Sequence, residues 1–513
     1  MKKKKINKRT KLHPVMSILF LILGVILLSG ILSFFNFSFT YNKINTTRFE
    51  YVSTTESIIN LFSLHGLKYI FANTVANFAN FKVLSNLIIM LIGIGIMDSS
   101  GFLEMAIGLF TRKAKKKTVT FILILICLLS SISGDIPFLA IIPLSALIFK
   151  YGKRNPNIGI IASYAALTSG YGLSLFFTSI DSSLSSLTTL SAKMLDSTFS
   201  INSFCLILFM VVAILLFSII LTQITETIIV RKLPKYEFNE DDVKEFNPSK
   251  HELKGLILAL FASIIYLIII IYNIIPGLPL SGNLLSRSET LYIDKLFGLN
   301  SFFSNGFVFI ITILFVILGL VYGIVTKKIK NNLDFINSLG YSLNGIGKTL
   351  VYIFAGSALI SIFKYSNIGN VIVAGFTNLI SNSNFSGLAL VILLFISTVI
   401  CTLFVPSSVT KWSIMSTSIV PTFLNAGMTA EFTQLVFRMG ECVSLAITPL
   451  FAYFIIYLAY LERETQNINK FGIGDAISYM IPYSVVTLFA LLGLIILWYL
   501  IGIPLGINGY VFL

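Results

Sequence analysis

Long apolar blocks separated by short polar and basic segments make up most of the chain. One helical crossing of a bilayer needs about 20 predominantly apolar residues. The segments that meet this length are residues 14–37, 83–100, 158–191, 203–229, 255–275, 305–326, 348–365, 434–461 and 477–502. The pattern therefore predicts an all-α polytopic membrane protein with about nine transmembrane helices.

Two further apolar stretches, residues 118–149 and 387–425, have an unusual length. Each is too long for one crossing, and two crossings with a turn need roughly 45 residues. The first lies between two basic clusters and contains Gly134, Asp135 and Pro137 near its middle. Two basic ends on one side of the membrane indicate a segment that enters and returns. We therefore predict two re-entrant helical hairpins.

Basic residues cluster in one set of loops, which the positive-inside rule assigns to the cytoplasm. These loops are residues 1–11, 112–117, 150–154, 231–235, 327–330 and 463–470. The opposite loops, residues 38–65, 276–304, 366–386 and 426–433, carry few basic residues. We expect a multi-pass protein of the cell membrane with a cytoplasmic N-terminus, whose hairpins enter from opposite faces.

Each hairpin is followed by a long apolar segment interrupted by small and polar residues, at 158–191 and 434–461. Hairpin plus broken helix, repeated in the opposite orientation, is the inverted-repeat layout of many secondary transporters. We expect residues 1–229 to form the first half, residues 230–254 a cytoplasmic linker, and residues 255–513 the second half.

The composition excludes several other classes. Hydrophobic residues are 56% of the chain, which has a net charge of +15. The basic residues stand beside the apolar blocks, so membrane topology explains the positive charge better than binding of a nucleic acid does. Gly345 to Thr349 resembles the end of a phosphate-binding loop, but an apolar span follows it. No catalytic or metal-ligand spacing is present, so we expect neither an enzyme nor a cofactor.

The hairpin tips and helix breaks are the places where chemistry is expected, because a helix can break in lipid only where protein or a wet cavity satisfies the freed backbone groups. Exposed amides at such breaks suit an anion, while carbonyl and hydroxyl oxygens suit a cation. The candidate residues at these places are Ser133, Gly134, Asp135, Ser174, Pro406, Ser407 and Ser408.

Ionisable residues within the expected membrane depth are costly and need a partner or a task. They are Asp135, Asp181, Lys411, Arg438 and Glu441. Arg438 and Glu441 lie three residues apart on one helix face, so a simple structural pair is one interpretation. In the functional interpretation, Glu441 and Asp181 take a coupling ion, Na+ or H+, and Arg438 binds a substrate carboxylate. A sodium ion would then lie near Gly134, Asp135, Ser408 and Glu441. Trp412 is either an aromatic wall for a substrate ring or ordinary core packing.

At these positions the chain resembles the AbgT family, the p-aminobenzoyl-glutamate transporters. The stretches that carry the resemblance run in family order over nearly the whole chain, and as a set they are specific. They are residues 13–14, 66–78, 141–144, 404–407, 411–412, 433–434, 438–441, 447–450, 472–474 and 482–483.

The resemblance implies a homodimer of nine-span subunits with two hairpins, transporting aromatic amido-acids or, in some members, exporting sulfonamides, with an ion gradient as the energy source. It implies a pathway through Asp181, Trp412, Arg438, Glu441 and Pro449. The chain departs from the family pattern at this site. Glu441 replaces an aspartate, Ser174 an asparagine and Val409 a serine.

The leading hypothesis is a secondary active transporter of a small organic anion, most simply a p-aminobenzoyl-glutamate-like compound. Two alternatives stay open at this point, a transporter of dicarboxylates or other aliphatic anions with a related hairpin fold, and a passive anion channel. A structural membrane protein without transport is a further class. Trp412 and Glu441 distinguish these hypotheses, because only an aromatic substrate needs the ring and only ion-driven transport needs the acid.

Overall fold

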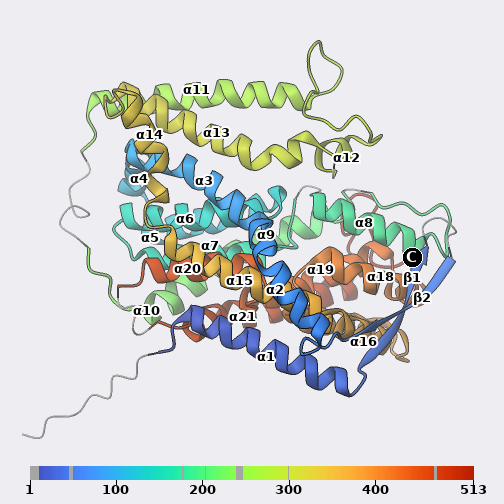
Figure 1. The fold of residues 1–513 in the computed structure, drawn as a ribbon. Coiled ribbons are helices and arrows are strands. Elements are labelled where there is room, and N and C mark those ends of the chain that lie inside the picture. Colours follow the sequence, from blue (N-terminus) through green and yellow to red (C-terminus); the bar gives the residue numbers. More distant parts are fainter. Residues whose placement is uncertain are drawn as a thin grey trace, which may run out of the picture.

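The computed structural model describes residues 11–45, 50–175, 178–202, 204–238, 247–298, 300–466 and 471–513. Within these ranges the chain is predominantly helical (Figure 1). The elements up to residue 232 are α1 (Pro14–Phe34), β1 (Ser38–Asn45), β2 (Glu50–Ser57), α2 (Leu64–Ala79), α3 (Lys82–Ser99), α4 (Phe102–Lys113), α5 (Lys116–Leu129), η1 (Ser130–Ser133), α6 (Ile136–Tyr151), α7 (Pro156–Ser169), α8 (Ser179–Ala192), α9 (Ile207–Ile224), η2 (Thr225–Ile229) and α10 (Val230–Lys232).

From residue 250 onward the chain continues with helices of very different lengths, and its α-helices range from the 6 residues of α12 to the 29 residues of α21. They are α11 (Lys250–Ile274), α12 (Tyr292–Phe297), α13 (Phe302–Val325), α14 (Asn332–Gly340), η4 (Tyr341–Leu343), α15 (Gly347–Ser366), α16 (Ile368–Ser381), α17 (Gly387–Phe404), α18 (Ser408–Asn425), α19 (Ala430–Ser444), η5 (Leu445–Ile447), α20 (Ala452–Arg463) and α21 (Ile473–Ile501). Of the linker predicted at 230–254, residues 239–246 lie outside the described ranges.

Nine helices in the described ranges are long and apolar enough to cross a membrane. They are Pro14–Phe34, Leu64–Ser99, Ile207–Lys232, Lys250–Ile274, Phe302–Val325, Gly347–Ser366, Gly387–Phe404, Ala430–Arg463 and Ile473–Ile501. The set differs from the prediction at three places. The predicted span 83–100 is part of a longer helical stretch, Leu64–Ser99, that begins with α2. The segment 158–191 divides into α7 and α8, of 14 residues each, and α17 reaches spanning length although it was predicted as a hairpin arm.

Both predicted hairpin regions are pairs of helices joined at a short break. Helices α5 and α6 meet at η1 and Gly134, whose φ of +63° is a backbone conformation that glycine adopts without a steric cost. Helices α17 and α18 meet at Val405–Ser407. At 1.5 Å per residue, the 14 residues of α5 extend only about 21 Å, less than the roughly 30 Å hydrocarbon core. This length agrees with a segment that returns, although re-entry itself stays a prediction.

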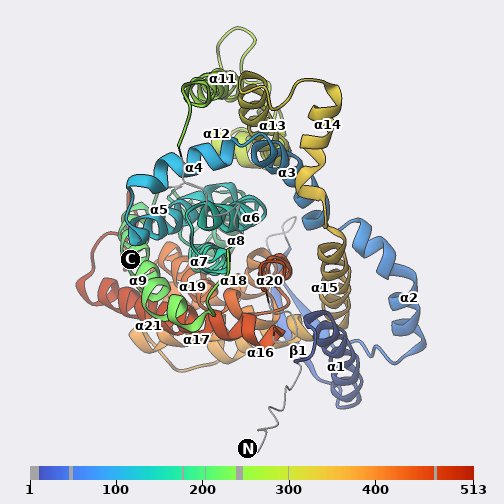
Figure 2. The same cartoon turned by 90° about the vertical axis from the view of Figure 1, so that its left-hand side faces the viewer.

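The helices form a central bundle with a separate outer layer. Helix α13 packs against α3 and α11, and these helices lie along the upper side of Figure 1. Helix α15 packs against α1, α2 and α20. Figure 2 shows α7, α19 and α20 in the middle of the molecule, with α5 and α6 on one side and α17 and α21 on the other. The two broken segments of the sequence therefore meet at the centre.

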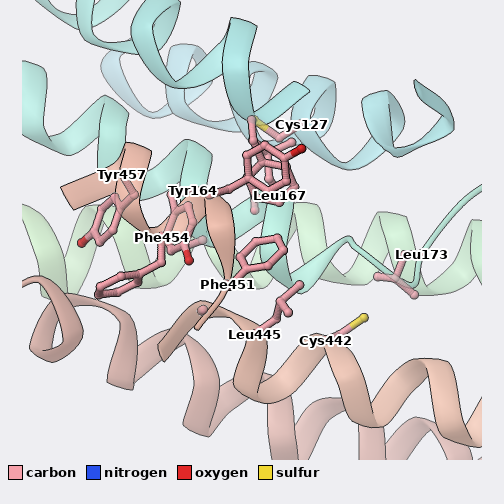
Figure 3. Packing of buried hydrophobic residues seen from close by; sticks show 14 of the residues in the cluster. Cys127, Tyr164, Leu167, Leu173, Cys442, Leu445, Phe451, Phe454 and Tyr457 are labelled. Atoms are coloured by element: carbon pink, nitrogen blue, oxygen red, sulfur yellow. The ribbon is translucent and has the colours of Figure 1, made fainter. Parts of the chain in front are cut away.

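Every residue of α7 and of α19 is buried, so these helices are surrounded by protein on all sides. Tyr164 of α7 stacks on Tyr457 of α20 with ring centroids 4.3 Å apart, and Phe454 contacts both rings. Figure 3 shows these rings packed between the two helices. Aromatic packing of this kind holds the two halves together beside the breaks.

One feature was not predicted, an antiparallel two-stranded sheet in residues 38–57, which were expected to be an outer loop. Its strands are rich in Thr, Tyr, Val, Ile and Phe, a composition that favours strands. Asn367, at the corner between α15 and α16, donates from Nδ2 to Glu56 Oε2 at 2.6 Å and to the Ser57 carbonyl at 2.9 Å. The sheet is therefore fixed to that corner.

Candidate functional site

The first break, between α7 and α8, is closed by groups from two other elements. Arg438 of α19 donates from Nη2 to the Tyr171 carbonyl at 2.8 Å, and Ser131 at the first hairpin tip donates to the Leu173 carbonyl at 2.8 Å. These bonds satisfy carbonyls that the unwound helix leaves free, as the membrane interior requires. A Cβ atom on Gly172 would lie 2.7 Å from the Arg438 carbonyl, so this close approach requires glycine.

The second break, between α19 and α20, is tied to the second hairpin in a similar way. Ser444 donates to the Val399 carbonyl at 2.7 Å, and Thr448 donates to the Leu403 carbonyl at 2.6 Å. Pro449 follows Thr448, whose extended backbone is the conformation favoured before proline. Each break is therefore bonded to the hairpin of its own half.

Four ionisable side chains form a continuous network beside these breaks. Arg438 Nη1 lies 3.0 Å from Glu441 Oε2, and Lys411 Nζ lies 2.8 Å from Glu441 Oε1. Arg438 Nη2 lies 3.5 Å from Asp181 Oδ1. The side chains of Lys411 and Glu441 are completely buried. The simple pairing of Arg438 with Glu441 is thus real, but it is one link in a larger network.

Asp181 has two roles in this arrangement. Its Oδ2 accepts hydrogen bonds from the backbone amide and hydroxyl of Thr178, which forms a capping box at the N-terminus of α8. Its Oδ1 faces Arg438. The residue therefore holds the start of α8 in position relative to α19.

A cavity of about 450 Å³ lies between the second hairpin tip, the exit of the second break and the corner of α15 and α16. Five aromatic residues, Tyr171, Phe363, Phe404, Phe451 and Tyr453, contribute to its walls, and Lys364 and Asn370 provide polar groups at the corner. Ser407 caps the N-terminus of α18 there, accepting from the Thr410 amide. The residues that line it are Asp135, Tyr171, Ile180, Ile360, Phe363, Lys364, Gly369, Asn370, Phe404–Thr410 and Leu450–Tyr453.

Asp135 of the first hairpin tip also reaches this cavity. The hydroxyls of Tyr171 and Tyr453 interact with its carboxyl group, while its Oδ1 has no hydrogen-bond partner among the described residues. Phe138, one turn along α6, stacks on Tyr453 with ring centroids 4.8 Å apart. Groups from both hairpins thus contribute to one cavity.

The structure brings only part of the predicted site together. Asp135, Pro406, Ser407 and Ser408 line the cavity, and Pro449 directly precedes its Leu450. Ser174 and Asp181 line a second, much smaller space of about 40 Å³, with Gln434. The side chain of Ser133 lies outside the described part of the structure.

Trp412 lies apart from the cavity-lining residues. Its side chain is fully buried, and its Nε1 donates to Thr188 Oγ1 at 2.8 Å. Its ring packs against Phe437, with centroids 4.4 Å apart. The geometry therefore favours the packing interpretation of Trp412 over a wall for a substrate ring.

The four residues expected near a sodium ion are likewise divided. Asp135 and Ser408 line the large cavity, while Gly134 lines a tiny space with Arg438. Both carboxylate oxygens of Glu441 already face cationic side chains, and Ser408 Oγ accepts from Arg438 at 3.2 Å. A hard cation needs several oxygen ligands around one point. These residues do not form such a set in this conformation.

Two residues of the site were missed in the sequence, Lys364 and Tyr453. Lys364 looked like an ordinary flank of the span 348–365, and Tyr453 like core of the last broken helix. A usable signal existed for the lysine, because it is a basic residue beside the loop 366–386, which was assigned to the outer face.

Three known proteins are similar to this chain over nearly its whole length. A protein of Escherichia coli (strain K12), the p-aminobenzoyl-glutamate transport protein, is 26% identical over 503 residues, covering 97% of this chain and 94% of that protein. The YdaH transporter of Alcanivorax borkumensis aligns with a TM-score of 0.49 at 24% identity, over 97% of this chain and all of that one. MtrF of Neisseria gonorrhoeae, described as one of a class of antimetabolite efflux pumps, aligns with a TM-score of 0.49 at 25% identity over 98% of each chain.

The sequence profile of the AbgT transporter family matches residues 7–513, almost the entire chain. The match includes both hairpins, both breaks and all four members of the ion-pair network. The expected resemblance is confirmed, and the chain belongs to the AbgT family of membrane transporters.

Proposed function

We propose that the protein is a secondary active transporter of a small organic anion of the p-aminobenzoyl-glutamate type, driven by a gradient of protons or sodium ions. Membership of a transporter family supports transport rather than catalysis. The name of the Escherichia coli relative supports this class of substrate.

The cavity between the hairpin tips is the observation that carries the proposal. Its volume of about 450 Å³ is within the range of small-molecule sites. Phe363, Phe404 and Phe451 offer apolar walls for an aromatic ring. Lys364 and the N-terminus of α18 offer a positive charge and free backbone amides for carboxylates. An aliphatic dicarboxylate would leave the aromatic walls without a partner.

In this mechanism the substrate lies between two groups of elements. Lys364 belongs to α15, whereas Asp135 and Ser408 belong to the two hairpins. We propose that the hairpins and broken helices move together against α15 and its neighbours, by an elevator-like or rocking motion, and expose the anion to each side in turn. The bonds between each break and its hairpin support their movement as one body.

Uptake and counterflow of labelled p-aminobenzoyl-glutamate in proteoliposomes test the proposal. We expect accumulation that depends on an imposed proton or sodium gradient, whose direction also separates symport from antiport. Gradient-independent flux under all conditions would indicate a passive channel. Saturating competition by an aliphatic dicarboxylate, with none by benzoyl compounds, would favour the alternative substrate class.

The variant Lys364→Gln sharpens this experiment at the residue level. Losing the charge opposite the substrate carboxylate is expected to raise KM about tenfold, equivalent to about 1.4 kcal/mol of binding free energy. Lys330→Gln is the matched control, because Lys330 is an exposed lysine in the connection between α13 and α14. An unchanged KM in Lys364→Gln would remove this lysine from the binding site.

We also propose a homodimer in the cell membrane with a cytoplasmic N-terminus. The family resemblance supports the dimer, and the gathering of α4, α10, α14 and the start of α1 at the left end of Figure 1 supports one basic, cytoplasmic face. The native mass of the detergent-solubilised protein tests the oligomeric state.

A further inference from the structure

We propose that the side-chain ammonium of Lys411 takes the place of a metal cation at Glu441, so that this transporter works without a sodium ion bound there. The inference rests on the proposed function, since it specifies how an ion-coupled carrier of this kind is built. It concerns the one acid of the network that is completely buried.

The contacts of Lys411 Nζ are those that a small cation would make. The atom lies 2.8 Å from Glu441 Oε1 and 2.9 Å from Thr402 Oγ1, and 5.8 Å from the centre of the Phe437 ring. Carboxylate and hydroxyl oxygens are also what a hard metal ion takes as ligands. Because the lysine side chain is fully buried, its ammonium holds this position without exchange with solvent.

The charges of the network balance without an added ion. Lys411 and Arg438 are cationic, and Glu441 and Asp181 are carboxylates. A sodium ion beside Glu441 would add an uncompensated positive charge at membrane depth, which is costly. Asp135 lies outside this set of ion pairs, on the cavity with the hydroxyls of Tyr171 and Tyr453.

The described residues offer no cluster of carboxylate, imidazole or thiol ligands for a metal ion. Among them, no group of three or more His, Cys, Asp or Glu side chains is placed to hold a metal ion. The ammonium also joins three elements, because Thr402 is on α17, Lys411 on α18 and Glu441 on α19. It therefore links both arms of the second hairpin to the broken helix, as a shared metal ion would.

Sodium ion alone is the probe for this inference, with purified protein in detergent. We expect that exchanging choline chloride for sodium chloride at equal ionic strength has the same effect on Tm in the wild type and in Glu441→Gln, and that the two bind the same amount of radioactive sodium. Lys411→Ala leaves space and one negative charge in excess. Its Tm should be lowered in choline chloride and raised again by sodium, by about 3–6 °C.

Two further variants separate the effect of losing the positive charge from the effect of opening a cavity at Lys411. Lys411→Met also removes the charge but fills the volume, so it should be destabilised without a response to sodium. Lys411→Ala combined with Glu441→Gln removes the excess negative charge, so the sodium response should disappear. A sodium response in either variant would contradict the proposed exchange of an ammonium for a metal ion.

Sodium binding to the wild type that Glu441→Gln abolishes, or a Lys411→Ala variant that folds without any sodium response, would overturn the inference. If Lys411→Ala does not fold, the comparison of radioactive sodium binding between the wild type and Glu441→Gln still decides. Failure of the proposed function is seen separately, as absent uptake of p-aminobenzoyl-glutamate in proteoliposomes, and it leaves the sodium measurements valid.

Discussion

At the residue scale, Trp412 shows how a side chain expected to line a substrate pathway joins three helices instead. Its indole donates to Thr188 Oγ1, and Thr188 in turn donates to Gln434 Oε1 at 2.6 Å. The chain of bonds connects α18, α8 and α19. Because the ring is fully buried against Phe437, its first role is to fix these helices relative to one another.

We expect Trp412→Phe to lower stability rather than substrate affinity. The variant keeps an aromatic ring but removes a buried donor, which costs about 1–3 kcal/mol of unfolding free energy. Its Tm should therefore fall by several degrees, while KM for p-aminobenzoyl-glutamate should stay within about twofold of the wild type. Differential scanning fluorimetry and uptake kinetics measure the two quantities.

The second tryptophan provides a control for that change. Trp498 donates to the Pro504 carbonyl at a longer distance of 3.4 Å, so Trp498→Phe should lower Tm less. A large rise in KM for Trp412→Phe with an unchanged Tm would place the indole on the substrate after all.

At the scale of elements, the two breaks depend on close packing as well as on hydrogen bonds. Gly172 lies where the unwound segment of the first break passes α19, and its amide donates to Cys442 Sγ at 3.1 Å. An added Cβ would approach Cys442 Sγ to 2.9 Å as well as the Arg438 carbonyl. Arg438 is the residue that bonds the freed Tyr171 carbonyl, so crowding at Gly172 acts directly on the charged network.

Gly172→Ala is therefore expected to disturb the site by far more than one methyl group would elsewhere. Overpacking of this kind costs about 1–3 kcal/mol, and we expect uptake to fall at least tenfold together with a lower Tm. Gly493→Ala in α21 is the control, since nothing lies within 4 Å of its added Cβ and alanine favours a helix. Normal uptake by Gly172→Ala would show that the break can move away from α19.

The positions of the hairpin tips could be predicted from the sequence, because the length of an apolar run and an internal Gly134-Asp135 or Pro406 are local signals. The breaks in the following helices were likewise indicated by small and polar residues within an apolar segment. The bonds that close the breaks could not be predicted. Nothing in the sequence distinguishes Ser131 from other serines, because its bond to the Leu173 carbonyl depends on the fold. The cavity position of Lys364 and the packing of Trp412 could not be decided from the sequence for the same reason, since hydropathy does not tell which side of a helix faces a cavity.

At the scale of the whole molecule, the arrangement separates a packed centre from a more peripheral layer. The broken helices α7 and α19 are buried throughout, whereas α11 exposes most of its apolar residues. In a bilayer the exposed apolar faces contact lipid, and charged groups are tolerated only inside the bundle. A carrier that exposes its substrate to each side in turn needs a binding site shielded from lipid, and the buried centre of the bundle provides such a place.

Both hairpins must return to the side from which they enter if they are to meet at that shielded site. Single cysteines at Lys115 and Lys153 flank the first hairpin, and single cysteines at Ser386 and Asn425 flank the second. All four positions are exposed, while the four native cysteines are free and buried, so the parent protein serves as an unlabelled background.

We expect a membrane-impermeant maleimide to label Lys115→Cys and Lys153→Cys only from the cytoplasmic side, and Ser386→Cys and Asn425→Cys only from the outer side. For the first hairpin the reason is length, because α5 and α6 are each too short to cross. For the second hairpin the reason is charge, because the loops 366–386 and 426–433 on both sides of it contain no Lys or Arg. Labelling of one hairpin's two flanks from opposite sides would make that segment a crossing. It would also carry its tip away from the cavity, and the transport mechanism based on two converging hairpins would then have to be abandoned.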